Sequence, residues 1–177
     1  MPFHTSGNNV VYSSPTWTQQ FVESDIALGD AIASGTLAPL STNIGKYERM
    51  CGTLNIFYNN DDANELFIRM RNIDKDGAAV ASTIKFAVLA AKGTIGNAGA
   101  AATGDSVAGV SVSTNGTGNT VKIDSGSNDS PLFLTAHFSV IVTAGTHGTL
   151  EVQASNVTAA TGASDILAGS YISYRRF

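Results

Sequence analysis

Two acidic turns contain the residues whose spacing comes nearest to that of a metal site. Asp61 and Asp62 lie in the first turn, and Asp74 and Asp76 lie in the second. A Ca²⁺ ion takes about six to eight oxygen ligands, and neither turn supplies that number of side-chain oxygens. Asp side chains in turns also accept hydrogen bonds from the backbone nearby. We therefore expect ordinary turns and no metal, with Ca²⁺ at Asp61 and Asp62 or at Asp74 and Asp76 as the alternative.

Imidazole and thiol groups are scarce in this chain. The three histidines are His4, His137 and His147, and the single cysteine is Cys51. A zinc site needs roughly three or four converging ligands, and no carboxylate at ligand spacing accompanies His137 and His147. A single cysteine forms no disulfide within the chain. We expect His137 on the polar face of a strand and His147 in a surface turn.

Ser106 is the serine whose neighbours most suggest a nucleophile. The triplet Gly104-Asp105-Ser106 occurs in one class of hydrolases, where an α/β sheet and a following helix position the serine. Here the triplet lies in a Gly/Ala-rich stretch, so that context is missing. The sequence also has no Gly-x-Ser-x-Gly, no phosphate-binding Gly-Lys-Ser/Thr loop and no His-Glu-x-x-His. We expect no catalytic residues, no cofactor and no enzymatic activity, with an esterase-like enzyme as a distant alternative.

The composition excludes two classes of partner. Charged residues make up 14% of the 177 residues and the net charge is −4, whereas an average soluble domain is about 25% charged. Proteins that bind nucleic acid through its backbone need a basic surface, so we expect no nucleic-acid partner. The longest mostly apolar stretch, residues 84–91, is too short to cross a bilayer. We expect no membrane partner and no secretory signal.

Apolar and polar residues alternate with a period of two through most of the chain after residue 50. The clearest example is residues 132–142, where Leu134, Phe138 and Val140 alternate with polar residues such as Thr135. Turn residues separate these runs, and no strand–helix–strand alternation is present. The pattern predicts an all-β fold of about eight short strands, an antiparallel jelly-roll or β-sandwich.

The chain divides into two regions at residue 47. Residues 1–47 lack the regular alternation, and we expect them to form a less regular N-terminal arm. Within the arm, residues 17–21 suit a strand, and residues 23–34 have the apolar spacing of a short helix. Residues 48–177 are expected to form the β-sandwich domain.

A Gly/Ala/Ser/Thr-rich stretch interrupts the β-sandwich domain at residues 93–119. It has few apolar side chains to offset the entropy of ordering the backbone. We expect most of it to be a long exposed loop, with weak strands at residues 107–113 and 120–124.

Two strands carry aromatic and basic side chains that are typical of a subunit interface. One strand places an aromatic residue and two arginines on one face. The last strand, residues 166–177, has large apolar residues on both faces, so one face should pack on the core and the other on a neighbouring subunit. The candidate interface residues are Phe67, Arg69, Arg71, Tyr171, Tyr174 and Phe177.

The order of segments near the C-terminus resembles a known group of virion proteins. FLTAHFSVIV at 133–142 is followed by GTLEVQAS at 148–155 and by LAGSYI at 167–172. This order is similar to the closing strands of trimeric jelly-roll proteins of tailed phages, the capsid decoration (cement) proteins, which share a C1q/TNF-like outline. The resemblance covers about the last 50 residues well, residues 50–92 loosely and residues 1–47 hardly at all.

The resemblance implies a non-enzymatic virion protein that is made in the host cytoplasm and located on the outer capsid surface. Its implied partners are two further copies of itself, in a homotrimer, and the major capsid protein. Residues 1–47 would contact the capsid, with Trp17 and Phe21 as candidate contact residues. The alternative is a receptor- or carbohydrate-binding head of a phage tail fibre or spike, with residues 93–119 as its contact surface.

Overall fold

The computed structural model describes residues 4–6, 9–11, 16–29, 35–59, 65–90, 94–97, 100–101, 108–113, 120–124, 132–156 and 164–177. Its elements are strands apart from one 3-10 helix, η1 (Ala38–Leu40), which confirms the all-β prediction. The strands are β1 (His4–Ser6), β2 (Asn9–Val11), β3 (Thr18–Phe21), β4 (Ile26–Ala27), β5 (Thr42–Ile44), β6 (Arg49–Asn59), β7 (Glu65–Ile73), β8 (Ser82–Ala90), β9 (Thr94–Asn97), β10 (Ala100–Ala101), β11 (Ala108–Ser113), β12 (Val121–Asp124), β13 (Leu132–Val142), β14 (Gly148–Asn156), β15 (Asp165–Ile166) and β16 (Tyr171–Arg176).

The strand pairing is nested. β3 pairs with β16, β5 with β14, β6 with β13 and β7 with β12, all antiparallel. Each pair lies inside the previous one along the sequence, so the chain is a long hairpin wound upon itself. That winding is a jelly-roll, and it confirms the predicted fold class.

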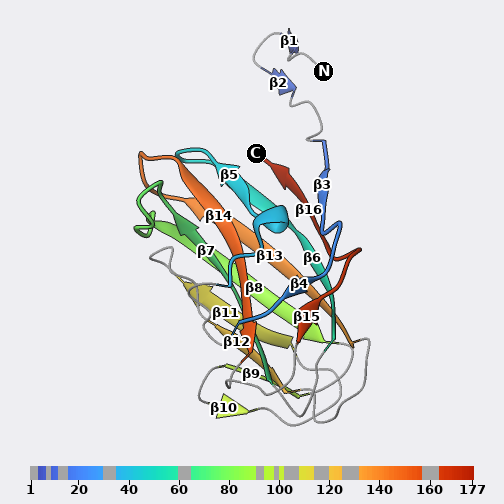
Figure 1. The fold of residues 1–177 in the computed structure, drawn as a ribbon. Helices are drawn as coiled ribbons and strands as arrows, with labels where there is room; N and C mark the ends of the chain where they lie inside the picture. The colour runs from blue at the N-terminus through green and yellow to red at the C-terminus, as the bar shows by residue number, and fades with distance from the viewer. Residues whose placement is uncertain are drawn as a thin grey trace.

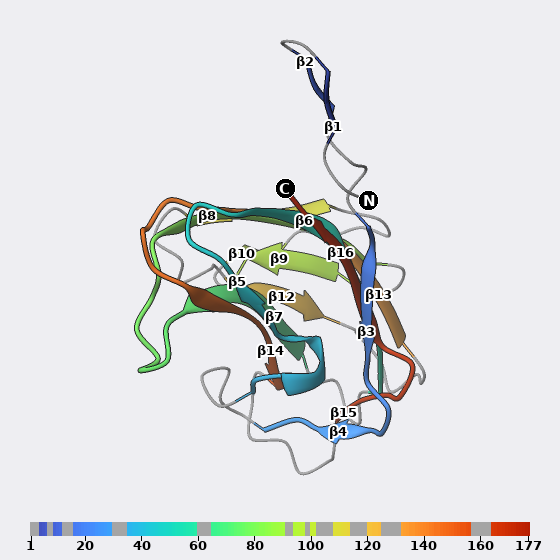
Figure 2. The same ribbon diagram turned by 90° about the horizontal axis from the view of Figure 1, so that it is seen from above.

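Two sheets result from this winding. The first, which we call the β6 sheet, has the order β3-β16-β6-β13 and continues through β8 and β11. The second, the β7 sheet, has the order β5-β14-β7-β12 and continues through β9 and β10. Figure 1 shows their strands, and Figure 2 shows the two layers curled round a common interior. β4 and β15 pair beside the end of β6, while β1 and β2 pair only with each other among the described strands.

The core follows from the two-residue period of the strands. In β6 the inward side chains Leu54, Ile56 and Tyr58 are at most 1% exposed. In β13 every second residue is likewise buried, including Leu134 and Val140. Burial of these side chains stabilises the fold by about 1.5–3 kcal/mol each.

The last strand is an interior strand of the β6 sheet, next to the edge strand β3. β16 lies between β3 and β6 and forms ladders with both. The turn before it places Gly169 at φ +89°, which a residue with a side chain rarely adopts. The hydroxyl of Ser170 accepts a hydrogen bond from the backbone N–H of Phe57 at 2.9 Å, which fixes the turn to β6.

The described part of residues 16–47 is built into the sandwich. β3 and β5 are the outermost members of the nested pairs, and Val22, Leu37 and Leu40 are buried in the core. The segment expected as an arm therefore contributes strands to both sheets.

Two local predictions were wrong. The helix expected over residues 23–34 is absent from the described residues 23–29, where Ile26 and Ala27 pair with β15 instead and the N–H of Leu28 bonds to Ser164. Part of the expected loop at residues 93–119 is strand, namely β9 and β10, whereas β11 and β12 confirm the weak strands expected at residues 107–113 and 120–124. Backbone ladders to β8 and β12 satisfy the N–H and C=O groups of β11 and β9.

Candidate interaction surface

The outward face of the β6 sheet collects the exposed apolar side chains. Six large hydrophobic residues are exposed in the described chain, and only Tyr47 lies elsewhere, in the turn before β6. The other five lie on or beside β3, β13 and β16: Trp17, Phe21, Phe133, Ile141 and Phe177. They are between 37% and 61% exposed. We call this surface the aromatic face.

Two ring pairs organise the aromatic face. The ring centroids of Phe21 and Tyr171 are 5.7 Å apart, and those of Phe57 and Phe133 are 5.9 Å apart. Each pair joins residues that are opposite in the strand register, because β3 pairs with β16 and β6 pairs with β13. The rings therefore support one another and present a fixed apolar surface.

Arg175 is held between two further rings of the aromatic face. Its guanidinium carbon lies 5.4 Å from the ring centre of Trp17 and 4.8 Å from that of Phe177. Its Nε is buried without a hydrogen-bond partner. Both rings attract the cation through their π faces, so the guanidinium is positioned while its donors remain unused by the described residues.

Two shallow hollows lie beside each other on the aromatic face. One, of about 330 Å³, is lined by Arg49, Cys51, Ile141 and Phe177 among others. The other, of about 230 Å³, includes Lys85, Ala87 and His137. Ser139 lines both hollows, so the surface is nearly continuous from β16 to β8.

The charges of the two sheets differ. The strands β3, β6, β8, β13 and β16 contain no Asp or Glu, although the whole chain has a net charge of −4. The aromatic face carries the outward cations Arg49, Lys85 and Arg175. The β7 sheet is balanced, because Arg71 lies 3.6 Å from Glu151.

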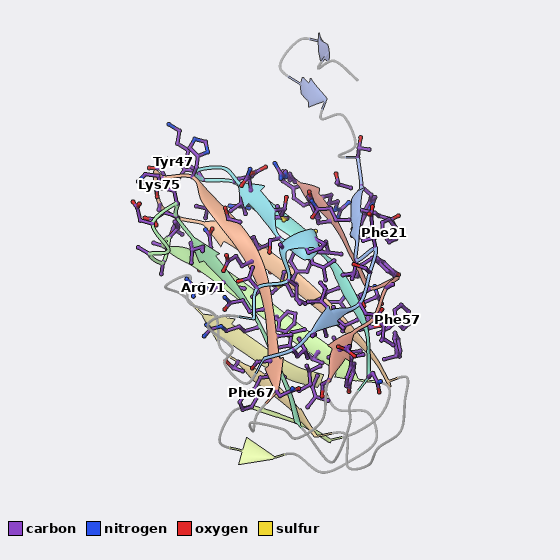
Figure 3. All side chains as sticks on the ribbon, in the orientation of Figure 1. Phe21, Tyr47, Phe57, Phe67, Arg71 and Lys75 are labelled. Atoms are coloured by element: carbon purple, nitrogen blue, oxygen red, sulfur yellow. The ribbon has the colours of Figure 1, made fainter. Side chains whose placement is uncertain are left out.

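The β7 residues expected at a subunit interface lie on the opposite side of the molecule. Figure 3 shows Phe67 and Arg71 on one flank and Phe21 and Phe57 on the other. Phe67 is half-buried, and Arg69 donates a hydrogen bond to Gln153 at 2.7 Å. Burial lowers the pKa of Arg69, and the charge of Arg71 acts in the same direction. The candidate interface residues are thus divided between two surfaces.

The candidate interface residues of the last strand also point to different sides of the β6 sheet. Tyr174 points inward, is 4% exposed, and shares a hydrogen bond with the Thr42 hydroxyl at 2.9 Å. Tyr171 and Phe177 point outward and join Trp17 and Phe21 on the aromatic face. The expected capsid contacts and two of the expected subunit contacts therefore form one surface.

The residues considered for metal chemistry have ordinary structural roles where they are described. A carboxylate oxygen of Asp74 accepts hydrogen bonds from the N–H groups of Asp76 and Ala78, both at 2.9 Å, which confirms the expected turn. No group of three His, Cys, Asp or Glu residues that could hold a metal occurs in the described part of the chain. Asp61, Asp62 and Ser106 lie outside the described residues.

None of the described segments is a helix with the length and apolar character needed to cross a membrane.

The residues that sequence reasoning missed are Phe57, Phe133, Ile141 and Arg175. A usable signal existed for two of them. Phe133 and Ile141 occupy the otherwise polar face of the alternating segment 132–142, where a globular monomer has no need for large apolar groups. The position of Arg175 between Trp17 and Phe177 depends on the pairing of β3 with β16, which the sequence pattern does not reveal.

No protein-family model matches the chain, and no curated protein matches it. The solved structures that resemble it include infectious bursal disease virus of the Gx strain, at 12% identity and a TM-score of 0.30. That comparison covers 99% of this chain and 44% of the viral chain. The VP2 subviral particle of the same virus is 10% identical with a TM-score of 0.27, over 99% of this chain and 44% of that chain. This chain therefore spans less than half the length of these viral chains.

Proposed function

We propose that the protein is a non-enzymatic virion structural protein, a capsid decoration (cement) protein that binds the outer capsid surface as a homotrimer and stabilises the head. The observation that carries the proposal is the aromatic face, which holds five of the six exposed large hydrophobic residues of the described chain. Exposed large apolar side chains that gather on one sheet face of a domain indicate a contact with a partner. The resemblance of the closing strands to phage decoration proteins supports the choice of partner.

The two surfaces receive different roles in this proposal. The aromatic face, with Trp17, Phe21 and Tyr171, contacts the major capsid protein. The outward face of β7, with Phe67 and Arg71, contacts the neighbouring subunit of the trimer. Weak contacts repeated by the symmetry of a trimer then give strong overall binding, and the head is stabilised because each trimer joins several capsid subunits.

The test is co-sedimentation with capsids of the encoding virus that lack this protein, together with light scattering on a sizing column. We expect the protein to pellet with capsids and to have a mass three times the 18.3 kDa of one chain. Phe21→Glu should abolish pelleting and leave the trimer intact. Phe67→Glu should reduce the mass to that of one chain, and Ala78→Glu, in an exposed turn, should change neither. A protein that stays in the supernatant would contradict the proposal.

A receptor- or carbohydrate-binding head of a tail fibre is the second candidate function. The observation that favours it is the set of exposed rings on the aromatic face, because sugars stack on such rings. A glycan array separates the two candidates. Glycan binding that is lost in the Phe21→Glu variant, without any capsid binding, would replace the decoration role.

A further inference from the structure

We propose that the aromatic face binds an acidic, partly apolar segment of a protein partner, and that Arg175 receives a carboxylate of that segment. The inference rests on the proposed function in one respect, since both take the aromatic face as the surface that meets the partner. It adds the chemistry of the partner, which the decoration role leaves open.

Acidic side chains are absent from five neighbouring strands of the β6 sheet. Neither Asp nor Glu occurs in β3, β16, β6, β13 or β8, and Arg49 and Lys85 are exposed there. The acidic residues that give the chain its net charge of −4 lie in other segments. Charge complementarity between partners favours an anionic surface opposite such a face.

Two aromatic rings fix the position of Arg175. Trp17 and Phe177 hold its guanidinium at 5.4 and 4.8 Å from their ring centres, and its buried Nε has no partner. No described residue accepts a hydrogen bond from this guanidinium. A carboxylate accepts two parallel N–H bonds from an arginine. Burial of Nε leaves the Nη groups as the donors that a partner reaches first.

The strand register sets the spacing of two cations on the aromatic face. Arg175 on β16 pairs with Cys51 on β6. Cys51 pairs in turn with Ser139 on β13, and Ser139 pairs with Lys85 on β8. Three strand spacings separate Arg175 from Lys85, or about 14 Å. Apolar side chains, among them Ile141 and Phe177, lie in the neighbouring positions. An extended segment with alternating acidic and apolar residues matches both the charges and the hollows.

Two other occupants fit less well. A second copy that met this face through its own aromatic face would bring Arg49, Lys85 and Arg175 towards like charges. A nucleic acid would meet only these three outward cations on a chain of net charge −4, whereas phosphate-backbone binding needs a more basic surface. Both occupants are outcomes of the test below.

The experiment uses the fluorescence of Trp17, the single tryptophan of the chain. The full chain is titrated with a short synthetic peptide in which glutamate alternates with leucine, and with a matched peptide of glutamine and leucine. We expect saturable binding of the acidic peptide, at least about tenfold tighter than the neutral one, because a hydrogen bond between two charged groups is stronger than one between neutral groups. The net negative charge of the chain opposes such binding. Binding of the acidic peptide would therefore come from the local positive charge of the aromatic face.

Variants locate the site. Arg175→Gln and Lys85→Gln should each weaken binding of the acidic peptide, Arg175→Gln by about tenfold. Lys75→Gln removes the same charge from an exposed turn and should bind like the unchanged protein. Thermal unfolding of each variant confirms that it is folded, and Lys85→Gln keeps the test valid should Arg175→Gln unfold.

Several results would overturn the inference. These are equal binding of the two peptides, an unchanged affinity in both Arg175→Gln and Lys85→Gln, or tighter binding of oligothymidine than of the acidic peptide. Self-association that Arg175→Gln abolishes, without peptide binding, would show a second copy to be the occupant. Peptide binding without capsid pelleting would refute the decoration role alone. Capsid pelleting without peptide binding would refute the inference alone.

Discussion

At the scale of single residues, the interior contains a polar group that the fold leaves unsatisfied. Tyr58 is 1% exposed, and its hydroxyl has no hydrogen-bond partner among the described residues. Burial raises the pKa of Tyr58 to about 12 from 10.0, because the low-dielectric core disfavours the tyrosinate. The ring fills the core, while the hydroxyl costs free energy.

We expect Tyr58 to make the protein lose stability in alkali. The pKa of Tyr58 is higher in the folded protein than in the unfolded chain. Above pH 10.0, the unfolded chain therefore releases the Tyr58 proton, while the folded protein keeps it. The free energy of unfolding should fall by up to about 2–3 kcal/mol between that pH and the folded pKa. Denaturant titrations across this range measure the loss. Tyr58→Phe should lack this component and be at least as stable at neutral pH; an identical alkaline loss in that variant would contradict the assignment.

Gly52 is required by a close approach of two strands. A Cβ at this position would lie 2.1 Å from the carbonyl oxygen of Ser173 and 2.8 Å from the ring of Phe138. Gly52→Ala should therefore destabilise the fold by about 1–3 kcal/mol or more, measured by thermal unfolding. Gly29→Ala is the control, since a Cβ there meets nothing within 4 Å. Equal melting temperatures of the two variants would contradict this prediction, because they would show that β6 and β16 can move apart without a loss of stability.

At the scale of elements, the last strand, β16, holds β3 and β6 together in one sheet. It lies between β3 and β6, and Ser170 anchors the turn that precedes it. The Ser170 side chain is fully buried. Its hydroxyl lies 2.9 Å from the N of Phe57, 3.1 Å from the O of Phe57 and 2.8 Å from the O of Leu167.

Ser170→Ala should loosen this turn. The change leaves the N–H of Phe57 without its acceptor, at a cost of about 1–3 kcal/mol. Hydrogen exchange at Phe57 should accelerate together with a fall in melting temperature. Ser24→Ala, at an exposed position, should change neither; unchanged exchange in the Ser170 variant would contradict the anchoring role.

The elements themselves were predictable from the sequence to a large extent. The alternation noted after residue 50 covers β6, β7, β8, β13, β14 and β16, because each has one face on the core. Alternation gave less information on β9 and β10, which are short and which the structure joins to the β7 sheet by backbone pairing. The turn at Asp74 to Gly77 was recognised, with Gly77 at φ +80°, but the strands on either side of it enter different sheets. Turn residues specify the reversal and do not specify the sheet that follows.

At the scale of the whole molecule, the two outward faces differ in kind. The β7 face ties its arginines to Gln153 and Glu151, whereas the aromatic face leaves rings and cations exposed. The sequence indicated Phe67 and Tyr171 together as candidate interface residues, without showing on which face of the molecule each lies. Only the winding of the jelly-roll, which assigns β7 and β16 to different sheets, separates them.

The central claim is that assembly on the capsid covers the aromatic face, and Cys51 measures this directly. It is the single cysteine of the chain, is partly exposed, and lies opposite Arg175. A maleimide should label Cys51 in the free protein and at least about tenfold more slowly in the capsid-bound protein. A Cys51→Ser, Ala78→Cys variant should stay reactive in both states. Equal labelling of Cys51 in the free and capsid-bound protein would contradict the account.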